Sequence, residues 1–505
     1  MAVAIVVIAI AVAVFNSWDT LRQLAPLVTQ SQIVELEDGD TYDLLASYVT
    51  KEIGGKTVKM LAYNGSIPGP TIRVPQGAEV TINFTNNTDM KALLHSHGVR
   101  MDNAFDGAQT SQEEMEPGES FSYTLKFPDA GVFWYHPHVN EVYGQALGLY
   151  GAFVVVPKDA AYFPPVNREE VLFLSDLPVE GGAIGIDKSG TDFSLMGHFG
   201  NVMLVNGQEN YALSARVGEV VRLYVINAAN VRPFNVSIPG ARIKVVGGDN
   251  GAYEKAFFAD SVVLAPSERA IVDVLITGPA EIVNQIPGRP VRLASITVDD
   301  EHIETSYGAL FEQLQENVDT QASIDPFRAY FDKAPDKTIT LTVDMMGMSG
   351  MGGHVMPDGT KMQGMMMAEV PEGGIEWEDR GMEMMNQMSN TGSIKWNIVD
   401  QSTGNKNMDI NWAFTRGQPV NIRIFNDPRS MHPMQHPIHF HGQRFLVVAR
   451  DGVRQSNLVW KDTTLVKAGE TVDIILDPSN PGTWMAHCHI SEHLAAGMML
   501  IFEVR

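Results

Sequence analysis

The chain has 505 residues, of which 44% are hydrophobic, and it contains 45 glycines and 27 prolines. This length suits about three domains of ordinary size, each with a buried core. The formal net charge of −24 excludes nucleic acid as an expected partner, because phosphate binding needs clustered lysine and arginine. The single cysteine excludes an internal disulfide.

The chain begins with an unbroken apolar run from Met1 to Phe15. This run is shorter than the roughly 20 residues that a helix needs to cross a bilayer. It resembles the apolar core of a signal peptide, or a trimmed membrane anchor. We therefore expect residues 1–30 to form a signal or anchor-like segment with its lead-in. The protein is then expected outside the cytoplasm (periplasmic, cell-surface or secreted), with membrane anchoring as an open alternative.

One pattern of alternating apolar residues occurs three times, beginning at Gly77, Gly218 and Gly417. In each copy, apolar residues follow the glycine at offsets of three, five and seven, and an asparagine follows at nine. This alternation predicts a half-buried strand that ends in a turn. Three copies predict three related all-β domains. The expected bounds are 31–160, 161–300 and 338–505 for the domains and 301–337 for a polar linker that we expect to be helical.

The first and third units carry matching pairs of histidines that are separated by one residue. The pairs are His95 with His97, His136 with His138, His439 with His441, and His487 with His489. The middle unit has no such pair, so we expect the two outer domains to face each other and the middle domain to act as a spacer. Catalytic zinc typically uses three protein ligands, and eight converging imidazoles therefore favour copper. We interpret the isolated His198, His302 and His354 as structural.

The only cysteine, Cys488, lies between His487 and His489. In an extended strand, side chains alternate between the two faces, so Cys488 points one way and both histidines point the other. One strand can thus hold two metal sites back to back. His493 and Met498 follow on the cysteine side at loop distances, and a set of thiolate, imidazole and thioether ligands is typical of a blue-copper centre.

These motifs resemble those of the multicopper oxidases of the three-domain type, which includes laccases and bacterial copper-efflux oxidases. The motifs are His95-Ser96-His97-Gly98, His136-Pro137-His138, the run from His436 to Gly442, and the run from His487 to Met498. The resemblance extends roughly from residue 55 to residue 505. It implies three cupredoxin-like Greek-key β-barrel domains. It also implies an enzyme that couples the one-electron oxidation of a substrate to the four-electron reduction of O2 to water.

The resemblance further implies a cofactor of four copper ions: one of type 1, one of type 2 and a type 3 pair. The type 1 ion would be held by His436, Cys488, His493 and axial Met498, and the type 2 ion by His95 and His439. One type 3 ion would be held by His97, His136 and His487, and the other by His138, His441 and His489.

Two acids are the expected catalytic carboxylates, and Cys488 is the expected path for electrons between the type 1 ion and the trinuclear cluster. Asp106 matches the carboxylate that supplies protons near this cluster in the family. Many bacterial members have a second acid directly after the residue that matches His493, where this chain has Leu494. We expect either that Asp106 takes a larger share of proton supply or that another acid, with Glu492 as the candidate, takes the second route.

Half of the 26 methionines lie in residues 345–388, among glycines and acids that leave them little core to fill. Thioethers bind Cu(I), so we interpret this Met-rich insertion as a site of Cu(I) capture beside the type 1 ion. The possible substrate-copper residues are Asp344, Met345, His432 and Met434. Met434 matches a substrate-copper ligand of copper-efflux oxidases, and His432 stands where that family has an acid.

Cu(I) is the favoured substrate, with copper detoxification as the role. The open alternative is a broad laccase-like oxidase of phenols, aromatic amines or Mn(II). A copper nitrite reductase is less expected, because those proteins place the type 1 cysteine in the first domain, where this chain has none. A non-catalytic copper-binding protein would explain the methionines but not the eight paired histidines.

Overall fold

The computed structural model describes residues 25–180, 183–299, 301, 303–345, 369–379 and 381–505. Its regular structure consists mainly of β-strands with a few short helices, which confirms the all-β prediction. Within these residues, no helix is long and apolar enough to cross a membrane. Most of the expected signal or anchor segment lies outside the described residues, so that expectation stays a prediction.

The strands of the first unit form two sheets that share one hydrophobic cluster. They are β1 (Ile33–Glu35), β2 (Thr41–Ile53), β3 (Lys56–Tyr63), β4 (Thr71–Pro75), β5 (Glu79–Asn87), β6 (Leu94–His97), β7 (Ser120–Lys126), β8 (Gly131–Pro137) and β9 (Gly151–Val156). One sheet has the order β3-β2-β5-β7 and the other the order β1-β4-β9-β8-β6. Two short helices, η1 (Asn103–Phe105) and α2 (Glu141–Ala146), lie in its loops.

The middle unit repeats this arrangement of two sheets around its own cluster. Its strands are β10 (Arg168–Leu177), β11 (Val179–Glu180), β12 (Ala183–Ile184), β13 (Val202–Val205), β14 (Tyr211–Arg216), β15 (Val220–Asn227), β16 (Phe234–Ser237), β17 (Ile243–Gly248), β18 (Gly251–Ala259), β19 (Ser261–Leu264), β20 (Arg269–Leu275), β21 (Ala280–Asn284) and β22 (Val291–Asp299). The large sheets have the orders β13-β10-β15-β20-β17-β18 and β14-β22-β21-β16-β19, and β11 pairs with β12.

The third unit again has two sheets, and its cluster includes Cys488 and Met498. Its strands are β23 (Lys337–Met345), β24 (Ile394–Asp400), β25 (Asn411–Phe414), β26 (Val420–Asn426), β27 (His436–Phe440), β28 (Arg444–Arg450), β29 (Val453–Arg454), β30 (Trp460–Lys461), β31 (Thr463–Val466), β32 (Thr471–Asp477), β33 (Gly482–Cys488) and β34 (Met499–Val504). The orders are β24-β23-β26-β32-β28-β29, with β30 also on β28, and β25-β34-β33-β27-β31. Its short helices are η3 (Glu372–Gly374), α5 (Glu383–Met388), η4 (Asn407–Asp409) and α6 (Ser491–Ala495).

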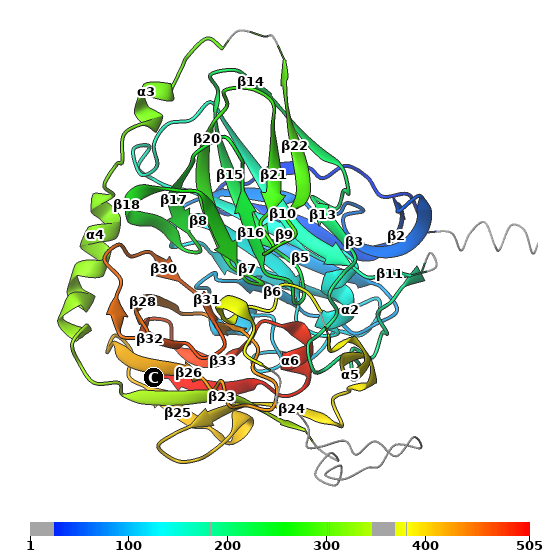
Figure 1. Ribbon diagram of the computed structural model, residues 1–505, viewed down its shortest axis with the longest axis vertical. Coiled ribbons are helices and arrows are strands. Elements are labelled where there is room, and N and C mark those ends of the chain that lie inside the picture. Colours follow the sequence, from blue (N-terminus) through cyan, green and yellow to red (C-terminus); the bar gives the residue numbers. More distant parts are fainter. Residues whose placement is uncertain (1–24, 181–182, 300, 302, 346–368, 380) are drawn as a thin grey trace, which may run out of the picture.

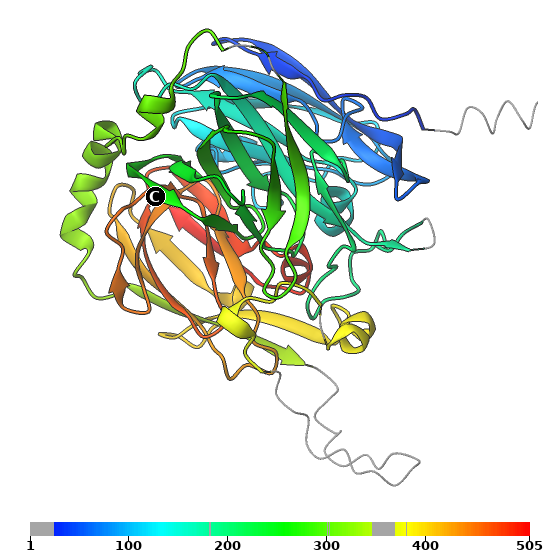
Figure 2. The same ribbon diagram turned by 45° about the horizontal axis from the view of Figure 1, so that its top comes forward.

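The segment expected to be a helical linker contains α3 (Gly308–Phe311), α4 (Val318–Ile324) and η2 (Asp325–Tyr330). Figures 1 and 2 show α3 and α4 along one edge of the molecule, between the green strands of the middle unit and the orange and red strands of the third. The strands and this segment fit the proposed order of domains, while the bounds given above stay a prediction.

The three copies of the repeated pattern form β5, β15 and β26, which occupy the same place in their sheets. Each pairs in parallel with one strand and antiparallel with another: β5 with β2 and β7, β15 with β10 and β20, and β26 with β23 and β32. The asparagine of each copy is buried, and its Nδ2 donates to a nearby peptide carbonyl. The bonds are Asn86 to Met90 O (2.7 Å), Asn227 to Arg232 O (2.9 Å) and Asn426 to Met434 O (2.7 Å).

The prediction of half-buried strands holds for β5 and is wrong for β15. Along β5, buried residues alternate with partly exposed ones. Every residue of β15 is buried, because Tyr224 and Ile226 on its second face pack in one cluster with Trp134 of the first unit. Docking between units therefore covers a face that the alternation predicts to be open.

Candidate metal centre

One group of buried side chains brings the single cysteine together with two histidines. Cys488 ends β33, His436 begins β27, and the pairing of these strands sets Ile438 opposite Cys488. The Cys488 Sγ lies 3.5 Å from His436 Nδ1 and 3.7 Å from His493 Nδ1. The two Nδ1 atoms are 3.2 Å apart. His493 comes from the short helix α6 rather than from the loop that we expected.

Two further side chains complete the surroundings of this group. Met498 is fully buried, and its carbonyl oxygen accepts a hydrogen bond of 3.1 Å from Cys488 N. The Trp396 indole stacks on the His493 ring with centroids 4.1 Å apart. Trp396 in turn donates from Nε1 to Ser194 O of the middle unit at 2.9 Å. The sequence contains no motif that points to Trp396, and only the packing of β24 against α6 reveals it.

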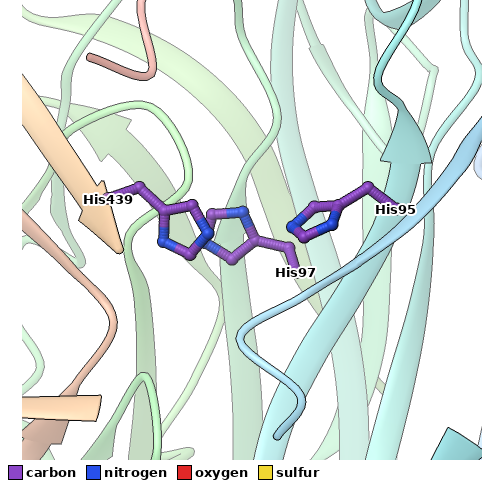
Figure 3. A group of neighbouring side chains, drawn as sticks. All are labelled: His95, His97 and His439. Carbon is purple, nitrogen blue, oxygen red and sulfur yellow. The ribbon is translucent and has the colours of Figure 1, made fainter. Parts of the chain in front are cut away.

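The eight paired histidines come together where the first and third units meet. They fall into three groups whose ligand atoms lie within 4.8 Å of one another. The groups are His95, His97 and His439; His97, His136 and His489; and His138, His441 and His487. All eight are buried. Figure 3 shows the first group, in which the rings of His97 and His439 stack with centroids 3.7 Å apart.

Two of these groups differ from the type 3 ligand sets that the resemblance implies, which put His487 with His97 and His136. That allocation is wrong, because His489 takes this place and His487 joins His138 and His441. The His487 Nε2 lies 3.0 Å from His441 Nε2. Strand periodicity places both histidines on one face of β33, but the docking of the two units decides which partners each one meets.

The histidine nitrogens fit metal ions. One ring nitrogen in most of the eight is held by a neighbouring oxygen: for example, His95 Nδ1 bonds Asp106 O at 2.7 Å and His487 Nδ1 bonds Cys488 O at 2.9 Å. Among the described residues, the opposite nitrogen is buried without a partner in His95, His97, His136, His138 and His439. Burial also lowers the pKa of His136, His138 and His487 well below the usual value, and a neutral imidazole is the form that binds a metal.

Asp106 lies inside this cluster and is fully buried. Its Oδ2 is 2.9 Å from His441 Nδ1, and its Oδ1 is 3.4 Å from His95 Nδ1. Burial alone raises the pKa of Asp106, but the neighbouring His441 and His95 lower it further, so that the net pKa lies well below the usual value. Asp106 is therefore placed as a charged acceptor that orients two histidines.

Glu492 lies on α6 and holds His198 rather than a cluster histidine. The Glu492 Oε1 accepts from His198 N at 3.0 Å and lies 2.7 Å from His198 Nδ1. The histidine that we interpret as structural thus belongs to the surroundings of α6, whereas His302 and His354 lie outside the described residues. The middle unit does more than separate its neighbours, because its segment around His198 and Ser194 covers the Cys488 group.

A third carboxyl group, Glu141 on α2, was not predicted from the sequence. Its Oε1 lies 3.8 Å from His489 Nδ1, and neither of its carboxyl oxygens has a hydrogen-bond partner within the described part of the chain. Burial, and then the charge of Glu492, raise the pKa of Glu141 to about 8. Helices α2 and α6 pack against each other, which brings these two acids together (Figure 1).

The four possible substrate-copper residues lie in different surroundings. The exposed Asp344 bonds Lys406 Nζ at 2.7 Å and Asn397 Nδ2 at 3.0 Å. His432 and Met434 are buried, and Met345 packs on the hydrophobic cluster that contains Met434. Among the described residues, no group at ligand distance includes Asp344 or His432. Residues 346–368 and 380 of the Met-rich insertion lie outside the described ranges.

Models of the multicopper oxidase family match residues 46–160, 185–283 and 379–505, which together make up more than half of the chain. The chain belongs to the multicopper oxidase family. The three matches fall on the three sets of sheets, and the first and last of them contain all of the histidine groups.

Named relatives agree with this membership. The multicopper oxidase MmcO of Mycobacterium tuberculosis is 25% identical over 88% of this chain and 83% of its own length. The multicopper oxidase mco of Staphylococcus aureus is 25% identical over 90% of this chain and 87% of its own. Laccase-22 of Oryza sativa subsp. japonica is 26% identical over 89% of this chain and 88% of its own.

Solved structures agree on the fold. The multicopper oxidase of Campylobacter jejuni, described as a metallo-oxidase, superimposes with a TM-score of 0.70 at 24% identity, covering 95% of this chain and 98% of that one. Lac15 from a marine microbial metagenome superimposes with a TM-score of 0.62 at 27% identity, covering 91% and 99%. The domains of this oxidase are therefore cupredoxin-like.

The protein is an oxidase that uses oxygen as the electron acceptor and four copper ions as its cofactor. When bound, the copper ions take electrons singly from a reducing substrate and pass them to dioxygen. The donor set suits this metal, since a buried thiol with two imidazoles and a cluster of neutral imidazoles are both copper-binding environments.

Proposed function

We propose that this oxidase takes electrons from Cu(I) and thereby serves in copper detoxification. The observation that carries the proposal is a set of methionines on and around the core of the third unit. Met345, Met382, Met385 and Met431 pack on the hydrophobic cluster that contains Cys488 and Met498. On α5, Met384 and Met388 are 72% and 74% exposed. Thioethers are soft ligands that select Cu(I), and exposed thioethers on the unit that contains Cys488 suit its capture.

The proposed copper ligands follow the groups described above. The type 1 ion is assigned to His436, Cys488 and His493 with Met498 as axial ligand, and the type 2 ion to His95 and His439. The type 3 ions are assigned to His97, His136 and His489 and to His138, His441 and His487. In this assignment Cys488 joins the type 1 ion to both type 3 ions, because its two neighbours in the chain are ligands of the cluster.

Asp106 and Glu492 remain the proposed catalytic carboxylates. The proposed role of Asp106 is supported by the bond between its Oδ2 and His441 and by its Oδ1, which lies 3.4 Å from His95 Nδ1. Glu492 begins a row of side chains that continues through His198 to Asp192. The Asp192 Oδ1 is 3.7 Å from His198 Nε2. The side chain of Asp192 is 35% exposed, so this row of groups extends from α6 toward solvent.

Oxygen uptake measured with Cu(I) and with a phenolic dye tests the substrate. The double variant Met384→Leu/Met388→Leu removes two exposed thioethers at nearly constant volume. We expect it to lower the rate with Cu(I) several-fold and to leave the rate with the dye unchanged. Met90→Leu, in a methionine that packs on the core of the first unit, is the matched control and should change neither rate. An equal loss with both donors in the double variant would refute capture of Cu(I) by these methionines.

A broad laccase-like oxidase of phenols, aromatic amines or Mn(II) is the second candidate, supported by relatives that are named laccases, such as Laccase-22 at 26% identity. It predicts dye oxidation at least as fast as Cu(I) oxidation in the unmodified protein.

We further propose an extracytoplasmic location, supported by the apolar run from Met1 to Phe15. Cell fractionation with N-terminal sequencing of the purified protein tests it, and recovery of the intact chain from the cytoplasm would contradict it.

A further inference from the structure

Arg269, the first residue of β20 in the middle unit, is buried where the three units meet. Its five N–H groups all donate: Nη1 to Asp462 Oδ1 (2.7 Å) and Ser267 O (3.1 Å), Nη2 to Asp462 Oδ2 (2.5 Å) and Asp249 O (3.3 Å), and Nε to Val132 O (3.2 Å). Val132 belongs to β8 of the first unit, and Asp462 lies between β30 and β31 of the third. One guanidinium therefore binds all three units.

Asp462, the partner of Arg269, holds two histidines of the cluster. Its Oδ1 lies 2.9 Å from His97 Nε2, and its peptide oxygen lies 2.9 Å from His439 Nδ1. The Thr463 hydroxyl, which donates to Asp462 Oδ1 at 2.9 Å, is also within 3.2 Å of His439 Nδ1. These bonds occupy opposite nitrogens of the two stacked rings in Figure 3, so the unpartnered nitrogen is Nδ1 in His97 and Nε2 in His439.

The close approach of this ion pair explains the glycine that follows His97. Gly98 has a φ of +82°, and a Cβ there would overlap Asp462 Oδ2 and lie 2.9 Å from Arg269 Nη2. A larger residue would push the carboxylate away from the His97 ring. A buried ion pair is by itself weak evidence for stability, because desolvation offsets much of the attraction. Its contact with two cluster histidines indicates a role in orientation.

We propose that Arg269 is a positioning residue of the trinuclear copper site: it fixes Asp462, which fixes the rings of His97 and His439. The inference rests on the proposed assignment of these two histidines as copper ligands. It means that the middle unit, whose described residues supply no member of the histidine groups, sets the geometry of a site shared by the other two. Groups that bond the ring nitrogen opposite the metal contribute to metal affinity, because they fix the orientation of the histidine ring and its tautomer.

A second buried Arg–Asp pair, formed between β15 and β20, provides a matched control. Arg222 Nε lies 2.8 Å from Asp273 Oδ1, and Arg222 Nη2 lies 3.0 Å from Asp273 Oδ2. Asp273 is on β20, four residues after Arg269, and this pair touches none of the histidine groups. Arg269→Lys and Asp462→Asn can therefore be compared with Arg222→Lys and Asp273→Asn, which disturb an ion pair of the same kind.

The holoenzymes are compared by copper content after competition with a chelator, by the EPR spectrum of the type 2 ion and by the blue type 1 absorption. We expect Arg269→Lys and Asp462→Asn to lose trinuclear copper about 10–100-fold more readily. Their type 2 spectrum should change, while the type 1 absorption stays. The control variants should keep the copper affinity and the type 2 spectrum even where the melting temperature falls. Asparagine has nearly the same shape as aspartate. If Arg269→Lys does not fold, the comparison therefore rests on Asp462→Asn and Asp273→Asn.

The inference would be overturned if the Arg269 and Arg222 variants retained copper equally and gave equal type 2 spectra, and if Asp462→Asn and Asp273→Asn did the same. A further variant, His97→Ala, separates this result from the ligand assignment. If His97→Ala loses trinuclear copper while Arg269→Lys and Asp462→Asn do not, the positioning role alone is wrong. If His97→Ala keeps all its copper and an unchanged type 2 spectrum, the ligand assignment itself fails, and the inference fails with it.

Discussion

At the scale of the residue, Cys488 belongs to one buried group while its neighbours in the chain belong to two others. Burial raises the pKa of the Cys488 thiol well above its usual value, so the thiol of the copper-free protein stays protonated. Binding a metal there must release this proton, because the thiolate is the ligand.

Replacing Cys488 by serine removes the soft ligand but leaves the eight paired histidines in place. We expect Cys488→Ser to lose the blue absorption, to keep the trinuclear copper, and to fall to background in oxygen uptake with any donor. Copper analysis should find about one ion fewer per chain than in the unmodified protein. Blue colour that persists in the variant would refute the assignment of Cys488 to the type 1 ion.

Glu141 makes the stability of the copper-free protein depend on pH. Its pKa is raised from 4.5 to about 8, first by burial and then by Glu492. Between these values the folded protein holds a proton that the unfolded chain has released, so the stabilising contribution is complete below the lower value and is lost as pH rises toward the higher one.

Glu141→Gln does not titrate, and it should therefore gain stability relative to the unmodified protein as pH rises through this window. The difference in the free energy of unfolding should grow by up to about 1.4 kcal/mol per pH unit. Denaturant unfolding of both copper-free proteins at several pH values measures it. Parallel pH profiles would show that Glu141 does not retain its proton in the folded state.

At the scale of the element, each copy of the repeat forms a strand with an asparagine at or next to its last residue. The side chain of this asparagine bonds the loop that follows. In the third unit, Asn426 at the end of β26 donates from Nδ2 to Met434 O at 2.7 Å and to Val466 O at 3.3 Å. Met434 stands two residues before His436, so this bond holds the approach to β27. In the middle unit, Asn227 makes the equivalent bonds to Arg232 O and Leu264 O, far from any cysteine.

Asn426→Ala and Asn227→Ala form a matched pair of variants. Each leaves buried carbonyl groups without a donor, so each should lower the free energy of unfolding by about 1–3 kcal/mol. Only Asn426→Ala should also shift the blue absorption, because only its loop leads to His436. Denaturant unfolding and visible spectra of both variants give the comparison, and a spectral shift shared by both would point to a general loosening instead.

At the scale of the whole molecule, the cluster of eight histidines is shared by the first and third units, so bound copper ties them together. The middle unit reinforces the same junction through Arg269 and through the segment that bonds Trp396 and Glu492. The function thus depends on how the units dock and not on any one of them.

Removal of copper should therefore lower the melting temperature and separate the unfolding of the units. A ligand that binds only the folded state adds about 2.7 kcal/mol when its free concentration is 100-fold above Kd. Calorimetry should show one transition for the loaded protein and a lower, broader or split transition after chelation. Cys488→Ser, which keeps the shared cluster, should retain most of this stabilisation. A melting temperature that is independent of copper would contradict the binding of copper across the junction.

The amino-acid sequence by itself determined the strands, the repeat and the sets of metal-binding residue types. These features depend on local regularities: period-two alternation predicts β5 and β26, and the pairs that begin at His136 and His487 stand at the same offset from Gly131 and Gly482. The Met-rich insertion was equally visible in composition, although its residues 346–368 lie outside the described ranges.

The tertiary structure alone decided which histidines meet. In the structure, His487 and His489 lie in the opposite groups from those expected, and the second face of β15 is buried. Glu141 lies beside His489, and Arg269 bonds Asp462. Each of these contacts joins residues from different units, and their sequence separation reaches 392 positions between His97 and His489. Such a contact depends on how whole sheets are oriented relative to one another, and the packing of the three units fixes that orientation. No local period of the sequence can therefore encode it.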